Sequence, residues 1–343
     1  MRKGINLIIA LALALIILCS VQTQTVSALP TSTIYIKPDG SVDPATAPIQ
    51  QAGNTYKLTA NINGTSIVVL KNNIVLDGQG FTLNSENSSN QAAVNLTCSG
   101  VTITNFHITG WLVGVLGVFD GNTIVGNNFT DNGYDVAIYA NNYNVIGNFI
   151  GSERIVGNNN VISKNEIGVR DNVSGFWISR SSGTIIESND VTFTKETTSF
   201  VSTDNENYQV THNNFLNIDA NTGGALVFVI GSGVPYWDNN YWSDYTSKYS
   251  NASQIGNSGI WDTPYVPTVL RTTILDRYPL ITPYNFTKPV MVVEPSSVPT
   301  SNPTAYPSIP EFSPWIAILI IVSVGLVAFF VNRKRLLENP RIP

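Results

Sequence analysis

The chain has 343 residues, of which 43% are hydrophobic and only 12% are charged, and its formal net charge is −5. Residues 29–313, between two apolar ends, hold 12 Lys and Arg against 22 Asp and Glu, a net charge of −10. This acidic balance argues against nucleic acid and anionic lipid as partners of that region. Residues 29–313 contain a single cysteine, Cys98, which excludes a disulfide within that region.

The N-terminus has the three parts of a secretory signal. Arg2 and Lys3 precede an unbroken apolar run over residues 7–18, and small residues at 26–28 suit a signal peptidase. An uncleaved signal anchor is the alternative, but the apolar run is short for a membrane span. We therefore predict a signal peptide over residues 1–28 and an exported protein.

The C-terminal end predicts a membrane anchor. Residues 314–331 are apolar and uncharged, and three basic residues follow at 333–335. This pattern indicates a single transmembrane helix, with a cytoplasmic basic tail over residues 332–343 and the rest of the protein outside the cell. Six prolines among Ser and Thr in residues 287–313 predict an extended stalk between the anchor and the folded part.

The middle of the chain repeats itself. Residues 122–129, 160–167, 184–191 and 208–215 share the template x-x-[Ile/Val]-x-x-Asn-x-[Ile/Val/Phe]. Two looser copies follow the same pattern: residues 101–108 have Phe106 at the Asn position, and residues 144–150 are one residue short. The template asparagines are Asn127, Asn148, Asn165, Asn189 and Asn213. Their spacing of 17 to 24 residues suits one coil of a β-solenoid.

The template has a physical rationale. Alternating apolar residues make a strand with one buried face, and Asn suits the turn because it tolerates left-handed backbone. Coils stacked about 4.8 Å apart place each Asn over the next, so that their amides can form a ladder. A weaker strand precedes each copy, and a polar residue at Ile162 or Ile186 should be costly because both face the core. A β-sandwich, the competing architecture, has no Asn column.

We therefore predict an all-β protein: a single-stranded right-handed parallel β-helix followed by one transmembrane helix. Residues 29–72 form the N-terminal cap through which the chain enters the β-helix. Residues 73–235 form its coils, and residues 236–286 form an aromatic C-terminal cap.

Residues 240–245 (Asn-Tyr-Trp-Ser-Asp-Tyr), with residues 261–266 and 276–280, resemble the end of NosD-like right-handed β-helix proteins. Residues 33–44 and 73–83 are similar to the start of the β-helix in that family's archaeal surface members. The aromatic residues of this end would cover the open edge of the last coil, with sugar binding as the alternative role. They are Tyr241, Trp242, Tyr245, Trp261, Tyr265 and Tyr278.

The NosD resemblance also implies copper handling, which the residues do not support. Copper sites use imidazole or soft sulfur ligands, and His107, His212, Cys98 and Met291 are not clustered in the sequence. We predict no metal and no cofactor. Residues 310–312 (Pro-Glu-Phe), together with the apolar span and the basic cluster, resemble a PEF-CTERM sorting signal, and a plain membrane anchor is the alternative.

Two functional classes remain open. The first is a non-catalytic surface module that binds glycans or serves the envelope or adhesion. The second is a polysaccharide lyase or hydrolase with a non-standard site. Its weak candidates are Glu166 and Asp190, which the template places in one outward column flanked by Asn128 and Asn214, and the loop residues Asp204 and Glu206. A nearby Arg170 or Arg180 would favour the enzyme.

Seven Asn-x-Ser/Thr sequons make the chain a candidate glycoprotein. The acceptors are Asn63, Asn87, Asn95, Asn128, Asn172, Asn251 and Asn285.

Overall fold

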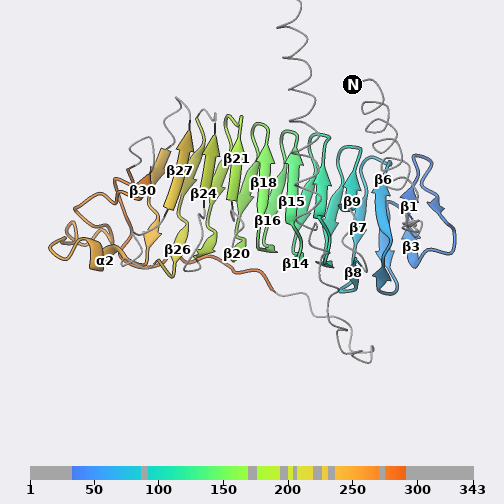
Figure 1. Cartoon of the computed structure of the whole chain (residues 1–343), viewed down its shortest axis with the longest axis horizontal. Coiled ribbons are helices and arrows are strands. Elements are labelled where there is room, and N and C mark those ends of the chain that lie inside the picture. Colours follow the sequence, from blue (N-terminus) through green and yellow to red (C-terminus); the bar gives the residue numbers. More distant parts are fainter. Residues whose placement is uncertain are drawn as a thin grey trace, which may run out of the picture. The chain divides into compact units, whose positions relative to one another are not determined.

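A computed structural model of the chain describes residues 33–85, 92–168, 176–193, 200–203, 207–218, 226–230, 236–269 and 275–290. The described strands form three sheets, which we name A, B and C. From β4 to β29 the chain visits sheets B, C and A in strict rotation, and the coils stack side by side (Figure 1). This is the predicted parallel β-helix, and it excludes the β-sandwich.

Within each sheet, every strand pairs with the next one along the stack. Sheet A consists of β2 (Val42–Asp43), β1 (Thr33–Ile36), β6 (Ser66–Val69), β9 (Ala92–Leu96), β12 (Val113–Gly117), β15 (Tyr134–Tyr139), β18 (Glu153–Val156), β21 (Phe176–Ser179), β24 (Phe200–Thr203), β27 (Leu226–Ile230) and β30 (Thr268–Val269). Sheet B consists of β28 (Tyr236–Asp238), β25 (Gln209–Thr211), β22 (Ile185–Glu187), β19 (Val161–Ser163), β16 (Asn144–Ile146), β13 (Thr123–Val125), β10 (Thr102–Thr104), β7 (Val75–Asp77), β4 (Thr55–Leu58) and β3 (Ile49–Ala52). Sheet C consists of β29 (Tyr241–Trp242), β26 (Asn214–Leu216), β23 (Asp190–Thr192), β20 (Glu166–Gly168), β17 (Phe149–Ile150), β14 (Asn128–Thr130), β11 (His107–Thr109), β8 (Thr82–Asn84) and β5 (Ile62–Asn63).

Each copy of the template forms two short strands, one in sheet B and one in sheet C, with the template Asn, or Phe106 in the first copy, at the corner between them. A weaker strand precedes each copy, as predicted, and these strands form sheet A. One expectation about the repeat was wrong: the copy at residues 144–150 is not short. Val145 pairs with Ile124, so the copy begins at Tyr143 and has the full length.

Like side chains stack over like along the interior of the coils. In sheet B the register runs through Ile103, Ile124, Val145, Ile162, Ile186 and Val210. Ile162 is fully buried and Ile186 is 2% exposed, as the template predicts. Burial of one such side chain stabilises the fold by about 1.5 to 3 kcal/mol, and because a single coil cannot shield its own apolar face, each coil depends on its neighbours.

The predicted asparagine ladder is present. The Nδ2 atom of Asn127 donates to Oδ1 of Asn148 at 3.0 Å, and the same bond links each later pair as far as Asn213 and Asn240, at 2.9 to 3.1 Å. Each Oδ1 also accepts from the backbone N–H of the ladder residue before it, at 2.9 to 3.0 Å. All six side chains are at most 1% exposed. Buried amides that are satisfied in this way fix both the corner and the register of the coils.

Asn was expected at the corner because it tolerates left-handed backbone, but the ladder asparagines do not adopt that conformation. The left-handed backbone falls on the residue before each ladder Asn, as in Lys164 with φ 58° and His212 with φ 57°. The ladder asparagines are not among the residues with positive φ. They are therefore selected for hydrogen bonding, while the residue before them adopts the strained conformation.

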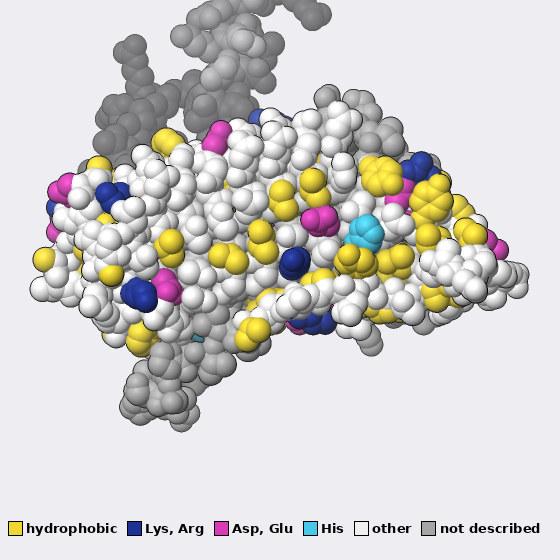
Figure 2. All heavy atoms as spheres, turned by 180° about the vertical axis from the view of Figure 1, so that it is seen from behind, with side chains coloured by type: hydrophobic (Ala, Val, Ile, Leu, Met, Phe, Trp, Pro, Cys, Tyr) yellow, Lys and Arg dark blue, Asp and Glu magenta, His cyan; other side chains and the backbone are white. Residues whose placement is uncertain are grey.

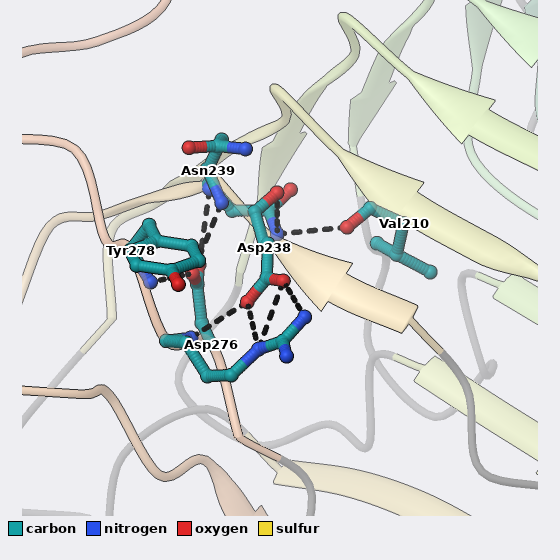
Figure 3. Close-up of polar contacts among 7 residues, drawn as sticks. Val210, Asp238, Asn239, Asp276 and Tyr278 are labelled. Atoms are coloured by element: carbon teal, nitrogen blue, oxygen red, sulfur yellow. Dashed lines mark hydrogen bonds and ion pairs between the residues drawn. The ribbon is translucent and has the colours of Figure 1, made fainter.

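The ladder ends on a carboxylate. The backbone N–H of Asn240 donates to Oδ2 of Asp276 at 3.0 Å, where the earlier coils have the next Asn oxygen. The indole Nε1 of Trp242 donates to the same oxygen at 2.9 Å. Figure 3 shows Asp276 beside Asp238, whose fully buried carboxylate holds the Arg277 guanidinium. Burial raises the pKa of Asp276 to about 6, against the hydrogen bonds from Trp242 and Asn240 that lower it.

Aromatic side chains pack onto the last coil. Trp242 stacks on Phe215 at 4.3 Å and on Tyr265 at 4.1 Å between ring centroids. Tyr245, which begins the short helix α2 (Tyr245–Lys248), stacks on Trp261 at 5.0 Å. At the other end, β2 pairs antiparallel with β1 and β3 pairs antiparallel with β4. Each end of the stack thus carries structure that differs from the repeating coils.

The predicted signal peptide, transmembrane helix and basic tail lie outside the described residues. In the part of the chain that the structure describes, no helix is both long and apolar enough to cross a bilayer.

One inward-facing position of sheet A breaks the apolar pattern. Glu153 in β18 is fully buried beside Val136, and neither of its carboxylate oxygens has a hydrogen-bond partner. Burial, with a smaller contribution from Asp135, raises the pKa of Glu153 to about 8. The folded protein therefore keeps a proton that the unfolded chain releases.

The first prediction concerns Glu153→Gln. Because the pKa is raised in the folded state, Glu153 makes the free energy of unfolding fall as the pH rises from about 4.5 to about 8. The variant should be more stable than the parent above pH 8 and should show a flatter pH dependence in chemical denaturation. The partly exposed Glu187→Gln serves as the control, and an unchanged pH profile of Glu153→Gln would contradict the assignment.

The second prediction concerns the ladder. Asn165→Ala removes the acceptor for the Asn148 N–H, at 2.9 Å, and the donor to the Val145 carbonyl, also at 2.9 Å. The buried groups left unpaired should lower the free energy of unfolding by about 3 kcal/mol. Urea denaturation measures the loss, with exposed Asn251→Ala as the control. Equal stabilities of the two variants would show that the ladder does not stabilise the fold.

Candidate functional site

Sheet C brings two of the candidate carboxylates together. Glu166 in β20 pairs directly with Asp190 in β23, and Asp190 pairs with Asn214 in β26. Asn128 lies in the same column but does not touch the pair, because Phe149 separates it from Glu166. Asp190 is only 3% exposed, whereas Glu166 is half-buried.

Both oxygens of Asp190 are engaged in the structure. Oδ2 forms an ion pair with the Lys288 ammonium group, and Oδ1 accepts a hydrogen bond from Asn214 Nδ2 at 2.6 Å. The hydrogen bond to Asp190 raises the pKa of Lys288, and the charges of Asp190 and Glu166 add to this shift. The ion pair with Asp190 therefore favours the protonated form of Lys288.

Lys288 belongs to a segment that we call the strap, residues 283–288. Figure 1 shows this segment in orange, running back from the C-terminal cap along the strands of sheet C. The Tyr284 N–H donates to Asn214 Oδ1 at 2.7 Å, and Asn214 Nδ2 donates to the Tyr284 carbonyl at 3.0 Å. The Tyr284 ring also lies 4.6 Å from the His212 ring. The strap is thus held by backbone, ring and ion-pair contacts.

A hollow of about 330 Å³ lies between the strap and sheet C. Its lining includes Asp190, Asn214, Leu216, Tyr284, Phe286 and Lys288. Its walls are largely apolar, and its charged groups, Asp190 and Lys288, form an ion pair with each other. A small ligand could enter it, but the Asp190 oxygens already have partners.

The other sequence candidates lie elsewhere. Asp204, Glu206 and Arg170 lie outside the described residues. Arg180 is exposed in the turn after β21, at the corner between sheets A and B, and so does not belong to the sheet C column. Among the acceptors of described sequons, Asn63, Asn251 and Asn285 are exposed, while Asn95 and Asn128 are half-buried in strands. Asn87 and Asn172 lie outside the described residues.

The histidines and the cysteine have separate structural surroundings. His107 lies between two threonine hydroxyls, 3.3 Å from Thr82 and 3.0 Å from Thr130. The Cys98 thiol donates to the Val69 and Lys71 carbonyls, and burial raises its pKa to about 11. Within the described ranges, no group of three or more His, Cys, Asp or Glu side chains is arranged to hold a metal.

Sequence reasoning missed a cluster on sheet A. The Arg154 guanidinium lies 5.1 Å from the centre of the Trp177 ring and 5.9 Å from that of Tyr139. Tyr139 is 46% exposed, and the Arg154 Nε atom is buried without a hydrogen-bond partner. The three residues come from consecutive strands of one sheet, β15, β18 and β21. Only the register of the coils brings them together, so no local motif could have revealed the cluster.

On the side shown in Figure 2, uncharged polar atoms cover most of the surface. Hydrophobic side chains are scattered among them, and some of the few charged side chains lie in pairs of opposite sign.

The third prediction tests the strap. Lys288→Met should leave the buried Asp190 carboxylate without its cation and loosen residues 283–288. Since Lys288 is 61% exposed, we expect a loss of only about 1 to 2 kcal/mol in the free energy of unfolding. Hydrogen exchange at the Tyr284 amide should accelerate. Lys57→Met, on the exposed side of β4, is the matched control, and adding Asp190→Asn should restore part of the loss. Unchanged exchange at Tyr284 would contradict this role of Lys288.

No protein-family model and no curated protein matches the chain. Among solved structures, the fold resembles mutant tailspike proteins of the E. coli bacteriophage HK620. One, in complex with a hexasaccharide, is 14% identical with a TM-score of 0.33, over 55% of this chain and 44% of that one. Another, in complex with a pentasaccharide, is 13% identical with a TM-score of 0.32, over 55% and 43%. The chain thus spans less than half the length of these proteins, and the likeness concerns the β-helix fold alone.

Proposed function

We propose that the protein is an exported, membrane-anchored surface protein whose β-helix binds glycans without cleaving them. The observation that carries this proposal is the cluster of Tyr139, Arg154 and Trp177 on sheet A. Tyr and Trp rings offer an apolar face together with a polar tip, and a sugar ring presents the matching combination of C–H groups and hydroxyls. Arg adds a planar set of donors beside the rings.

The state of the sheet C carboxylates supports binding over catalysis. A general acid or base must be free to exchange a proton with the substrate. Asp190 is instead buried, with one oxygen paired to Lys288 and the other bonded to Asn214. Removing it from these contacts to act on a substrate would also release the strap.

Export and anchoring rest on the sequence. The charged start and apolar run of residues 1–28 suit secretion, and the apolar residues 314–331 followed by basic residues suit a single span. The NosD-like motifs and the PEF-CTERM-like segment favour an archaeal surface protein. In this proposal the Pro-rich residues that follow the strap, 289–313, hold the β-helix away from the membrane.

One observation favours the enzymatic alternative, a lyase or hydrolase acting on acidic glycans. Glu166 and Asp190 pair on adjacent strands, Lys288 lies beside them, and a hollow opens at the same place. Stacked carboxylates with a lysine could support such chemistry, so the two functions need a direct test.

The fourth prediction separates them. Incubation of the purified full-length chain with polyuronates, with and without calcium, should release neither unsaturated nor new reducing ends, while immobilised glycans should retain the protein. Asp190→Asn should leave retention unchanged. Release of sugar ends that Asp190→Asn or Glu166→Gln abolishes would establish the enzymatic alternative. A failure of every glycan to retain the protein would refute the binding function.

A further inference from the structure

We propose that the outward face of sheet A binds a carboxylated sugar, whose carboxylate is held by Arg154 between the rings of Tyr139 and Trp177. This inference rests on the glycan-binding function proposed above and names the ligand class and its site.

The register defines the face on which these residues lie. Asn95 pairs with Leu116, Leu116 with Ala137, and Ala137 with Arg154. Arg154 in turn pairs with Trp177, so one side chain from each of β9, β12, β15, β18 and β21 forms a straight column. Tyr139 lies two residues along β15 from Ala137, on the same side of the sheet, because side chains alternate along a strand. These five positions form a track across five coils, in which Arg154 and Trp177 are direct neighbours, and the register continues from Trp177 to Val201.

The track carries a single formal charge. From β6 to β30, the only charged residues in the described strands of sheet A are Asp135, Glu153 and Arg154. Asp135 and Glu153 are both fully buried, so neither is available to a ligand on the surface. Arg154 is half-exposed, and it stands alone on an otherwise uncharged face of a protein whose region 29–313 carries a net charge of −10. This placement favours a ligand that brings one localised negative charge to a mostly neutral surface.

Arg154 also lacks the partners that an arginine at a structural position usually has. Its Nε atom is buried without a hydrogen-bond partner, and no ion pair joins it to another described residue. The Nε1 atom of Trp177 and the Oδ1 atom of Asn95, in the same column, are also buried and unpaired. Unpaired buried polar atoms are costly, so the column is not optimised for stability alone, and the half-exposed guanidinium group of Arg154 has no ion-pair partner within the described residues.

The chemistry of these groups selects the ligand. A guanidinium group binds a carboxylate with two parallel N–H···O bonds, and it does so most strongly where water is excluded. The flanking rings hold the guanidinium plane and offer stacking surfaces for sugar rings. A sugar ring that carries a carboxylate, bound at Arg154 as one unit of an oligosaccharide, meets these requirements.

A protein partner is the competing occupant. Val118 and Phe119, at the turn after β12, are 42% and 48% exposed, and such apolar groups are common in protein interfaces. The Arg154 cluster favours the sugar, because a carboxylated sugar ring can pair with the guanidinium group and stack on the neighbouring rings.

The fifth prediction compares two ligands on the full-length chain. An oligogalacturonate should bind more tightly than a maltooligosaccharide of the same length, as measured by calorimetry. Arg154→Gln should weaken binding of the oligogalacturonate by about ten- to a hundredfold and leave that of the maltooligosaccharide nearly unchanged. Arg154→Lys should fall between the parent and Arg154→Gln, because it keeps the charge but loses the paired N–H bonds.

Matched variants distinguish this site from general effects. Lys57→Gln removes one exposed positive charge from β4 in sheet B and should not alter binding. Trp177→Phe should weaken binding of both oligosaccharides, and thermal unfolding of each variant verifies that it is folded. Oligosaccharide binding that is insensitive to Arg154→Gln, or a preference for the neutral ligand, would overturn the inference and leave glycan binding itself intact. Absence of binding to either ligand would refute the glycan-binding function in its present form. Self-association that Arg154→Gln abolishes would instead make this face an interface between copies of the chain.

Discussion

The asparagine ladder is the interaction on which the rest of the structure depends. Each amide satisfies a backbone N–H of one neighbouring coil, a carbonyl of the coil behind it, and the amide of the next coil. A shift of register by one residue would break all three contacts and would turn the apolar column of sheet B toward water. The ladder therefore fixes which side chains face outward on sheets A and C, and with them the Arg154 cluster and the Glu166–Asp190 pair.

The regular part of this fold could be predicted from the sequence because the repeat records it directly. Asn and Ile recur at fixed places, and stacking then follows from the need to shield apolar faces. Asn240 extends the ladder but escaped prediction, since Trp237 and Trp242 take the places that Ile, Val or Phe occupy in the template. The spacing of the template asparagines could not predict Asp276. This residue lies 36 positions after Asn240, within the aromatic cap, and only folding brings its carboxylate to the end of the ladder.

The functional residues were harder to predict, because contacts between coils, and not the repeat itself, bring most of them together. Glu166 and Asp190 share a template position, so their pairing could be derived. Lys288 was assigned to the stalk on the strength of its proline-rich neighbours, whereas an ion pair with Asp190 holds it against sheet C. Arg154 and Glu153 adjoin each other in β18 yet face opposite sides of sheet A, one outward and the other into the core. The repeat does not predict a charged side chain on either side of sheet A at β18.

The direction of the ladder has an electrostatic consequence. Each amide from Asn127 to Asn213 donates from Nδ2 to the amide of the next coil, so these amide dipoles align head to tail. Such an array places partial positive charge at its C-terminal end, as a helix does at its N-terminus. Asp276 stands at that end, and an ionised carboxylate accepts hydrogen bonds but donates none. Its negative charge offsets the partial positive charge at the end of the ladder, and because it donates no hydrogen bond, the ladder of side chains ends at Asp276.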